Sequence, residues 1–426
     1  MKKIIILLVI AGAGYLGYNE FIAKDGEKID ITKAIGGSDS AQATAEQLKA
    51  DFISNTSRDK IHDALADYVF NNTQVGQLMT TGFEKEGINK DQAIAELKKA
   101  VDIRVEYNDI KATSSGDKAI LNIANPRLEI ASKDERAMAF ELTGTNMQFT
   151  QVGDDANHTI IKLPTDLTIL GDEALLDMAM GGRAGAPKGN KVKLFTIASS
   201  DNLIETKLNQ QGQVIAQNTA FNDVELVEGR GNTSLAKIKS WVDNREFSYE
   251  GDQMKATRKS EISNIEPGDM VKLMLGNIKP VSIISNGSYE GDNIENLFTQ
   301  MIEAKETGSE FPKFDGKGIL DEVSIATAGS KLAFSGDVNF SKTAKHGAPS
   351  GVIDVNFSDY QNFVNYLNTT FPMVPAEEVN KVFNGLKELG GSGSDINMVI
   401  DFTDINNVTI NGKNQQELQA IMAKYR

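Results

Sequence analysis

The chain has no cysteine, only three histidines and a single tryptophan among its 426 residues. The absence of cysteine excludes disulfide bonds, thiol catalysis, a lipid-modified cysteine anchor and metal sites built from thiolates. His62, His158 and His346 are far apart in the sequence, and none has the H-x-x-x-H or H-E-x-x-H spacing of a zinc site. We therefore predict neither a metal site nor a cofactor.

Positive charge is scarce as well. Lysine and arginine number 44 against 59 aspartates and glutamates, which gives a formal net charge of −15. Because nucleic acids require a basic surface, we expect no nucleic-acid partner, and broad adhesion to anionic lipid surfaces is disfavoured too. The apolar content of 40% is high enough for a sizeable core, so most of the chain should fold.

A long apolar run occurs at the N-terminus. After two lysines it extends from Ile4 to Tyr18, and it reaches roughly the 20 residues of a membrane span if it continues to Ala23. Two interpretations stay open, an uncleaved signal anchor and a cleaved signal peptide. The anchor is preferred because cleavage after the small residues at 11–13 leaves a short hydrophobic segment. The lysines then stay in the cytoplasm and the body lies outside. The predicted anchor residues are Ile4, Leu7, Leu8, Ile10 and Leu16.

Composition and periodicity divide the chain into four parts. Residues 1–23 are the predicted transmembrane signal anchor. Residues 24–45 are rich in small and polar residues, which predicts a flexible linker. Residues 46–266 begin with a helical segment and continue as a β-meander lobe, and 267–426 form a second β-rich lobe with strand-helix units. Pro267-Gly268 marks the predicted boundary between these two lobes.

The helical signals precede the strands. Apolar residues recur at near-helical intervals from residue 46 to 70, and Asn89 with Gln92 three residues later predicts the start of a second helix. Further along the chain the period at which apolar residues recur changes from 3.6 to 2 residues. Turn residues such as Ser115-Gly116-Asp117 and Asn125-Pro126 separate short segments in which apolar and polar residues alternate. Sequential short strands with tight connections predict an antiparallel meander with one apolar face and one wet face.

Strand-then-helix units follow in the C-terminal half, beginning at Ile283, Val352 and Val408. In each unit a strand ends at a small polar residue and an amphipathic helix follows, with apolar residues at i, i+3 and i+4. The predicted fold class is α+β and predominantly antiparallel β. It comprises an N-terminal transmembrane helix and then a long curved β-meander with amphipathic helices packed on it.

This organisation resembles the AsmA-like envelope proteins, and in layout the YdgA-like group of Gram-negative bacteria. The resemblance is architectural, and its one local match is the terminal phrase Thr409-Ile410-Asn411-Gly412-Lys413. It implies curved sheets whose apolar inner face shelters lipid chains. It also implies a protein anchored in the inner membrane with its body in the periplasm. No catalytic residues come with it.

Serine motifs of cell-wall acyl enzymes occur in scattered form. Ser115 and Ser234 each begin an S-x-x-K sequence, and Ser200-Asp201-Asn202 spells S-D-N. Ser115 lies in a predicted hairpin turn, and Ser234, which could open a helix, follows the S-D-N where those enzymes require it to come first. A serine acyl enzyme is therefore a distant alternative, and we predict that the protein is not an enzyme.

We predict a membrane-anchored periplasmic binding or scaffold protein, whose partners are the inner membrane and a lipid or envelope proteins. In the binding hypothesis, the repeat helices and the apolar sheet face hold an acyl chain or a partner segment. The alternative is a structural or regulatory protein that presents its body to other envelope proteins. The candidate ligand-binding residues are Phe298, Met301, Ile302, Phe363, Tyr366, Leu367, Leu418 and Ile421, although residues of this kind more often form an ordinary core.

Overall fold

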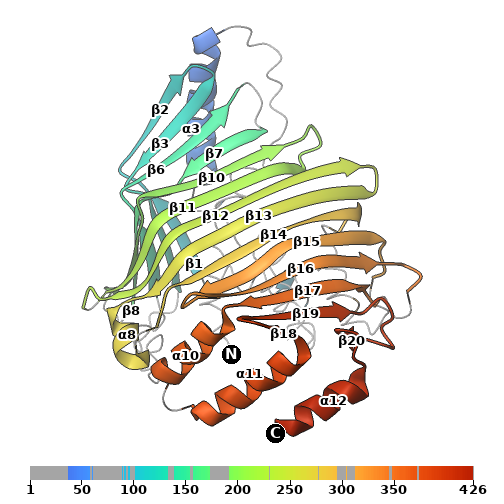
Figure 1. Ribbon diagram of the computed structural model, residues 1–426. Helices are drawn as coiled ribbons and strands as arrows, with labels where there is room; N and C mark the ends of the chain where they lie inside the picture. Colours follow the sequence, from blue (N-terminus) through green and yellow to red (C-terminus); the bar gives the residue numbers. More distant parts are fainter. Residues whose placement is uncertain are drawn as a thin grey trace. The chain divides into compact units, whose positions relative to one another are not determined.

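The computed structural model describes residues 37–57, 60, 89, 91–92, 95, 101–132, 139–153, 157–172, 191–229, 231–276, 278–294, 304, 312–344, 348–371 and 374–425. They form an α+β protein with mostly antiparallel strands, which confirms the predicted class at this level (Figure 1). No helix in the described part is long and apolar enough to cross a membrane. The predicted anchor at 1–23 lies outside the described residues.

The chain divides into two compact units. Unit 1 comprises Met1–Leu203 and Leu226–Thr233, and unit 2 comprises Ile204–Glu225 and Ser234–Arg426. Strands β10 (Asp201–Leu208) and β11 (Val214–Glu228) contribute residues to both units. Both residues of the predicted lobe boundary, Pro267-Gly268, belong to unit 2.

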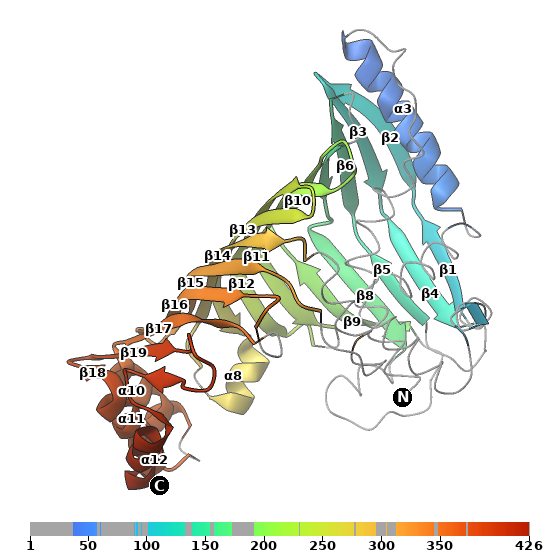
Figure 2. The same ribbon diagram turned by 90° about the vertical axis from the view of Figure 1, so that its right-hand side faces the viewer.

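Unit 1 contains two antiparallel ladders. One has the strand order β1, β4, β5, β8 and β9 (Figure 2), and the other has the order β2, β3, β6 and β7 (Figure 1). The first ladder consists of β1 (Val101–Glu106), β4 (Arg127–Ser132), β5 (Ala139–Thr143), β8 (Asp166–Asp172) and β9 (Lys191–Ala198). The second consists of β2 (Asp109–Ser115), β3 (Lys118–Ala124), β6 (Asn146–Val152) and β7 (His158–Lys162).

Short corners carry the chain from one ladder to the other. Between β3 and β4 stand only Asn125, which has φ 49°, and Pro126. The Asn125 amide donates to the Thr145 carbonyl at 2.7 Å, and the Thr145 hydroxyl donates to the Asp166 carboxylate at 2.6 Å. A Cβ on Gly144 would lie 2.5 Å from the Pro164 ring, so this corner requires glycine. Hydrogen bonds therefore join successive corners to each other.

The corners correct the prediction of a simple meander. Asn125-Pro126 was predicted to connect strands that pair with each other, but β3 pairs with β2 and β6, whereas β4 pairs with β1 and β5. Asn and Pro permit a bend as readily as a full reversal, so the residues locate the break without giving its angle. The hairpin predicted at Ser115-Gly116-Asp117 is confirmed, with Ser115 opposite Lys118.

Helix α3 (Gly37–Asn55) covers the apolar face of β2 and β3. Ala45 is fully buried and Ala41 nearly so, against a sheet face that contains Leu121 and Ile123. The predicted linker over 24–45 is therefore wrong from residue 37 onward, because alanine both favours helix and lets it approach the sheet closely. At the second predicted helix start, Asn89 and Gln92 exchange the expected capping bonds.

Unit 2 is built on one ladder of long antiparallel strands in the order β12, β13, β14, β15, β16, β17 and β19. These are β12 (Ser234–Glu250), β13 (Gln253–Pro267), β14 (Val281–Asp292), β15 (Gly316–Thr327), β16 (Ser330–Phe340), β17 (Ser350–Ser358) and β19 (Asp395–Asp401). Two short strands, β18 (Gly391–Ser392) and β20 (Thr409–Ile410), pair with β19. Because Ser234 begins a strand, the suggestion that it opens a helix is wrong.

The helices of unit 2 are α8 (Asp269–Leu275), α10 (Tyr360–Thr370), α11 (Ala376–Gly390) and α12 (Gln415–Lys424). Two predicted strand-helix units are confirmed, since β17 leads into α10 and β20 leads into α12. The helix predicted after β14 falls mostly outside the described residues. A core cluster joins α10, α11 and β19 through the buried side chains of Tyr360, Val364, Val379 and Ile396.

Candidate functional site

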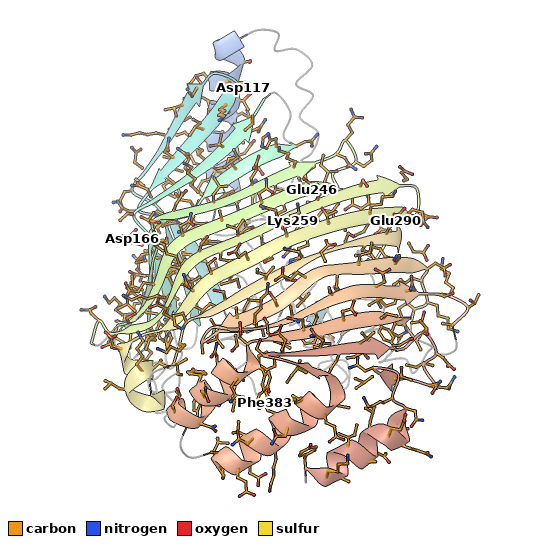
Figure 3. All side chains as sticks on the ribbon, viewed as in Figure 1. Asp117, Asp166, Glu246, Lys259, Glu290 and Phe383 are labelled. Carbon is orange, nitrogen blue, oxygen red and sulfur yellow. The ribbon has the colours of Figure 1, made fainter. Side chains whose placement is uncertain are left out.

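The long strands of unit 2 have one polar face and one apolar face. Glu246, Lys259 and Glu290, labelled in Figure 3, belong to the polar face of β12, β13 and β14. On this face charges pair across strands, for example Lys255 with Glu290 at 2.9 Å. Alternation places the other half of each strand's side chains on the opposite face.

On the apolar face the strand register aligns one large apolar side chain from each of seven strands. We name this set the apolar row: Trp241, Ile262, Ile283, Ile325, Leu332, Phe357 and Ile396. The adjacent register line continues the apolar surface on β15, β16, β17 and β19 with Val323, Phe334, Val355 and Met398. Directly opposed apolar side chains stabilise neighbouring strands, so the row helps to hold the ladder in register.

The two ends of the apolar row differ in their environment. At the C-terminal end Ile396 is fully buried in the α10–α11 core, and the Phe357 ring lies 5.6 Å from that of Phe363. At the other end the Trp241 ring stacks on Phe221 at 5.4 Å. Between them Ile325 is 47% exposed, and its row neighbours are only half-buried. A large apolar side chain exposed to this extent amid other apolar residues is typical of a contact surface.

Three charged residues lie on the same apolar face. Arg245 and Arg258 are directly opposite each other on β12 and β13. Asp243 lies two residues before Arg245 on β12, and therefore on the same face. The Asp243 carboxylate accepts from Arg245 Nε at 2.9 Å and Nη2 at 2.5 Å, and from Arg258 Nε at 2.9 Å. Its side chain is 6% exposed, whereas those of the two arginines are 41% and 49% exposed.

The electrostatics of this triad follow from its geometry. Burial raises the pKa of the Asp243 carboxyl, but the hydrogen bonds from Arg245 and Arg258 outweigh it, and the net pKa lies below the ordinary value. Two guanidinium groups against one carboxylate give the triad a local charge of about +1 at neutral pH. The chain as a whole carries −15, so the triad is a local positive site within an acidic protein.

Small residues stand next to the arginines on the apolar face. Gly287 is paired with Arg258 on β14. Ser260 and Ser285 are paired with each other on β13 and β14, between the arginines and the apolar row. A Cβ on Gly287 would lie 2.5 Å from the Ile319 carbonyl oxygen, so the backbone itself requires glycine there. No bulky side chain is therefore placed beside Arg258 on β14.

The predicted ligand-binding residues fall into three groups. Phe363 and Leu367 on α10 pack in or against the core that covers the end of the apolar row. Ile421 on α12 is buried and Leu418 half-buried, but neither belongs to that cluster. Phe298, Met301 and Ile302 lie outside the described residues, as do the anchor residues Ile4, Leu7, Leu8, Ile10 and Leu16.

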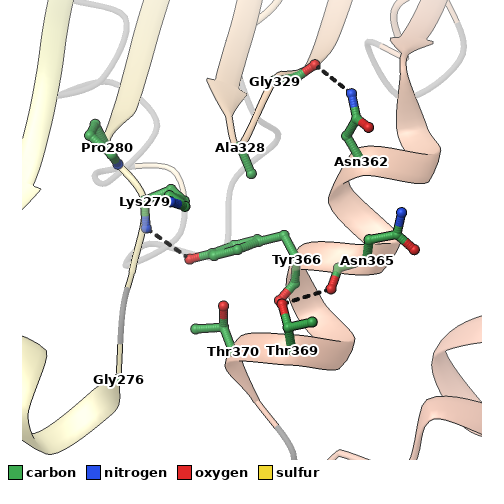
Figure 4. Close-up of a pocket in the computed structure, with 10 residues that line it drawn as sticks. All are labelled: Gly276, Lys279, Pro280, Ala328, Gly329, Asn362, Asn365, Tyr366, Thr369 and Thr370. Atoms are coloured by element: carbon green, nitrogen blue, oxygen red, sulfur yellow. Dashed lines mark hydrogen bonds between the residues drawn. The ribbon is translucent and has the colours of Figure 1, made fainter.

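The remaining predicted residue, Tyr366, lines an open pocket of about 930 Å³ beside α10 (Figure 4). Its hydroxyl accepts from the Lys279 amide at 3.3 Å, and across the pocket Asn362 Nδ2 donates to the Gly329 carbonyl at 3.4 Å. The other lining residues include Asn365, Thr369 and Thr370. The lining mixes these polar side chains with apolar groups such as Pro280 and Ala328, and the pocket is open to solvent.

The residues of the serine motifs lie in a corner, at a hairpin turn and at the start of a strand. Asn202 of the S-D-N sequence donates to the Pro164 carbonyl at 2.9 Å and to the Ser199 hydroxyl at 2.5 Å, so it supports a corner of unit 1. Ser115 ends β2 at the hairpin turn and Ser234 begins β12.

A comparison with protein-family models finds no match for this chain, and a search of curated proteins finds none either.

The sequence prediction missed the apolar row and the arginine triad. The alternation along β12 and β13 was visible, including Phe247, Tyr249 and Met254. However, alternation gives the face of each residue and not its partner across the strand, which depends on register. Two arginines that are thirteen positions apart in sequence become neighbours only through the β12–β13 hairpin.

Proposed function

We propose that this protein binds the acyl chain of a lipid along the exposed part of the apolar row. The observation that carries the proposal is the continuous line of large apolar side chains from Trp241 to Leu332, with Ile325 47% exposed in its middle. The apolar run from Ile4 to Tyr18 supports a further part of the proposal, that the protein is held at the inner membrane and faces the periplasm.

The dimensions of the row suit one acyl chain. From Trp241 on β12 to Leu332 on β16 the row crosses four strand spacings of about 4.8 Å, about 19 Å in all. A lipid chain in one leaflet spans about 15 Å, half of the roughly 30 Å hydrocarbon core of a bilayer. Each methylene removed from water contributes about 0.8 kcal/mol, so contact along this line is sufficient for reversible binding.

The single tryptophan makes the proposal directly testable. Because Trp241 is the only tryptophan of the chain, quenching of its fluorescence by a bromine atom reports a ligand at the apolar row. We expect methyl 11-bromoundecanoate, used below its aggregation concentration, to quench Trp241 saturably in the full chain.

A matched pair of variants on β15 provides the control. Ile325→Ser removes an apolar side chain from the row, and Ile319→Ser changes a 36% exposed isoleucine on the polar face of the same strand. We expect the first variant to weaken binding about tenfold and the second to leave it unchanged, since only the first loses contact with the chain. Equal effects of both variants, or no saturable quenching of the natural chain, would exclude the proposal.

A second candidate function, contact with a protein partner, is favoured by exposed apolar residues on the helices. Leu273 on α8 is 88% exposed and Val382 on α11 is 60% exposed. Crosslinking in cells through a photoreactive residue at position 382 tests it. A specific protein adduct that disappears when the residue is moved to the polar-face position 259 supports a scaffold role, and its absence argues against one.

A further inference from the structure

We infer that Arg245 and Arg258 bind the anionic head group of the amphiphile whose chain lies on the apolar row. The inference rests on the proposed acyl-chain binding and adds a chemical class to it: the ligand carries a carboxylate or phosphate at one end. The reason is the placement of two half-exposed guanidinium groups on the same face as the apolar row.

The triad leaves hydrogen-bonding capacity on both arginines. Asp243 engages Nε and Nη2 of each guanidinium, so within the described residues both Nη1 groups are without a partner. By holding one edge of each group, the carboxylate fixes their orientation in advance. A guanidinium presents its donors in a rigid fork that matches a carboxylate or phosphate. Two such forks, side by side on β12 and β13, form one anion site whose donors come from both strands.

The distance between head group and chain also fits. Arg245 is four residues from Trp241 on β12, which corresponds to about 13 Å along an extended strand. On β12, β13 and β14, the positions between the two on this face are Asp243 and the small residues Ser260 and Ser285. An anion at the arginines therefore has its chain directed over small side chains, and a chain of about 15 Å reaches the Trp241 end of the apolar row.

A purely structural triad is the competing explanation. Salt bridges across strands occur without any ligand, and on the polar face Lys255 and Glu290 form one as a simple pair. The triad differs because it contains one more cation than anion and lies on the face that bears the apolar row. Its excess charge is complementary to an anionic ligand.

The test compares two probes with the same bromoalkyl chain, one with a charged carboxylate and one with a neutral methyl ester. 11-Bromoundecanoate and its methyl ester are titrated against the full chain, and quenching of Trp241 is recorded at pH 7. We expect the acid to bind about tenfold more tightly than the ester, as a charge-assisted hydrogen bond would produce. Sodium acetate should not displace the acid at millimolar concentration, since it lacks the chain; displacement would indicate a site for free anions and overturn the inference.

Variants then assign the preference to the triad. Arg245→Gln and Arg258→Gln should each abolish most of the acid preference and leave ester binding unchanged, while Lys259→Gln, next in sequence on the polar face, should alter neither. Asp243→Asn should strengthen acid binding, because removing the carboxylate raises the local charge of the site from about +1 to about +2. That increase is not expected of a triad that only stabilises the fold.

The two proposals fail in different ways. If neither probe quenches Trp241, the acyl-chain site itself is absent. If both quench equally, or if the arginine variants fold with their urea midpoints preserved and keep the acid preference, the chain site stands and the head-group inference is overturned.

Discussion

Asp243 is a buried carboxylate whose two partners are arginines facing each other across β12 and β13. Asp243→Asn leaves the opposed guanidinium groups without their shared anion, so we expect the free energy of unfolding to fall by about 2 kcal/mol at pH 7. The control is Glu246→Gln, on the polar face of the same strand, which should change stability by less than about 0.5 kcal/mol. Urea denaturation of both variants measures the difference, and equal midpoints would contradict the assigned role.

The pH dependence of this difference has a defined sign. The folded state lowers the pKa of Asp243, so the carboxylate contributes stability above its unfolded pKa of about 3.9 and loses it as the pH falls through the folded value. The gap between the natural chain and Asp243→Asn should therefore be constant near neutrality and narrow below about pH 4. A gap that widens on acidification would show that another group dominates.

At the scale of elements, α3 is fixed to unit 1 by small residues rather than large ones. Ala45 is fully buried against the sheet, whereas Ala43 on the same helix is exposed. Ala45→Leu should destabilise the protein by about 1–3 kcal/mol through overpacking, and Ala43→Leu should have almost no effect. Thermal unfolding of the two variants compares them. Equal melting temperatures would mean that α3 does not pack on β2 and β3 in solution.

Strand β19 provides a second matched pair. Ile396 is fully buried against the α10–α11 core, whereas Val399 on the opposite face is 42% exposed. Truncation of Ile396 to alanine should cost about 2–5 kcal/mol because it leaves a cavity, and Val399→Ala should cost well under 1 kcal/mol. Denaturation midpoints that shift equally would contradict the assignment of the apolar face to the core.

The elements were largely predictable because each depends on local sequence. Alternation gave the strands, and apolar spacing gave α10 and α12. The linker prediction over 24–45 failed because small and polar residues are typical of linkers, but the same alanines form a helix once a sheet is available to cover. The corner at Asn125-Pro126 was mistaken for a hairpin turn because both need the same residue types.

At the scale of the whole molecule, what could not be predicted is long-range register. The apolar row joins seven strands between Trp241 and Ile396, and no local sequence pattern predicts that these residues are neighbours. Of the candidate ligand residues, Phe363 and Leu367 were placed correctly on an apolar helix face, but they close one end of the row rather than its open part. The site depends on strand pairing, which sequence periodicity leaves undetermined.

Photocrosslinking locates directly where a lipid chain lies on the protein. The full chain, purified with its N-terminal segment, is incubated with a fatty acid that carries a diazirine in its chain, irradiated and digested, and the modified residues are identified by mass spectrometry. If the chain lies on the apolar row, we expect adducts on apolar-face residues of β12 to β16, such as Trp241, Ile262 and Ile325, and few on Lys259 or Glu290 of the polar face. Adducts confined to the polar face, or spread equally over both faces, would contradict it.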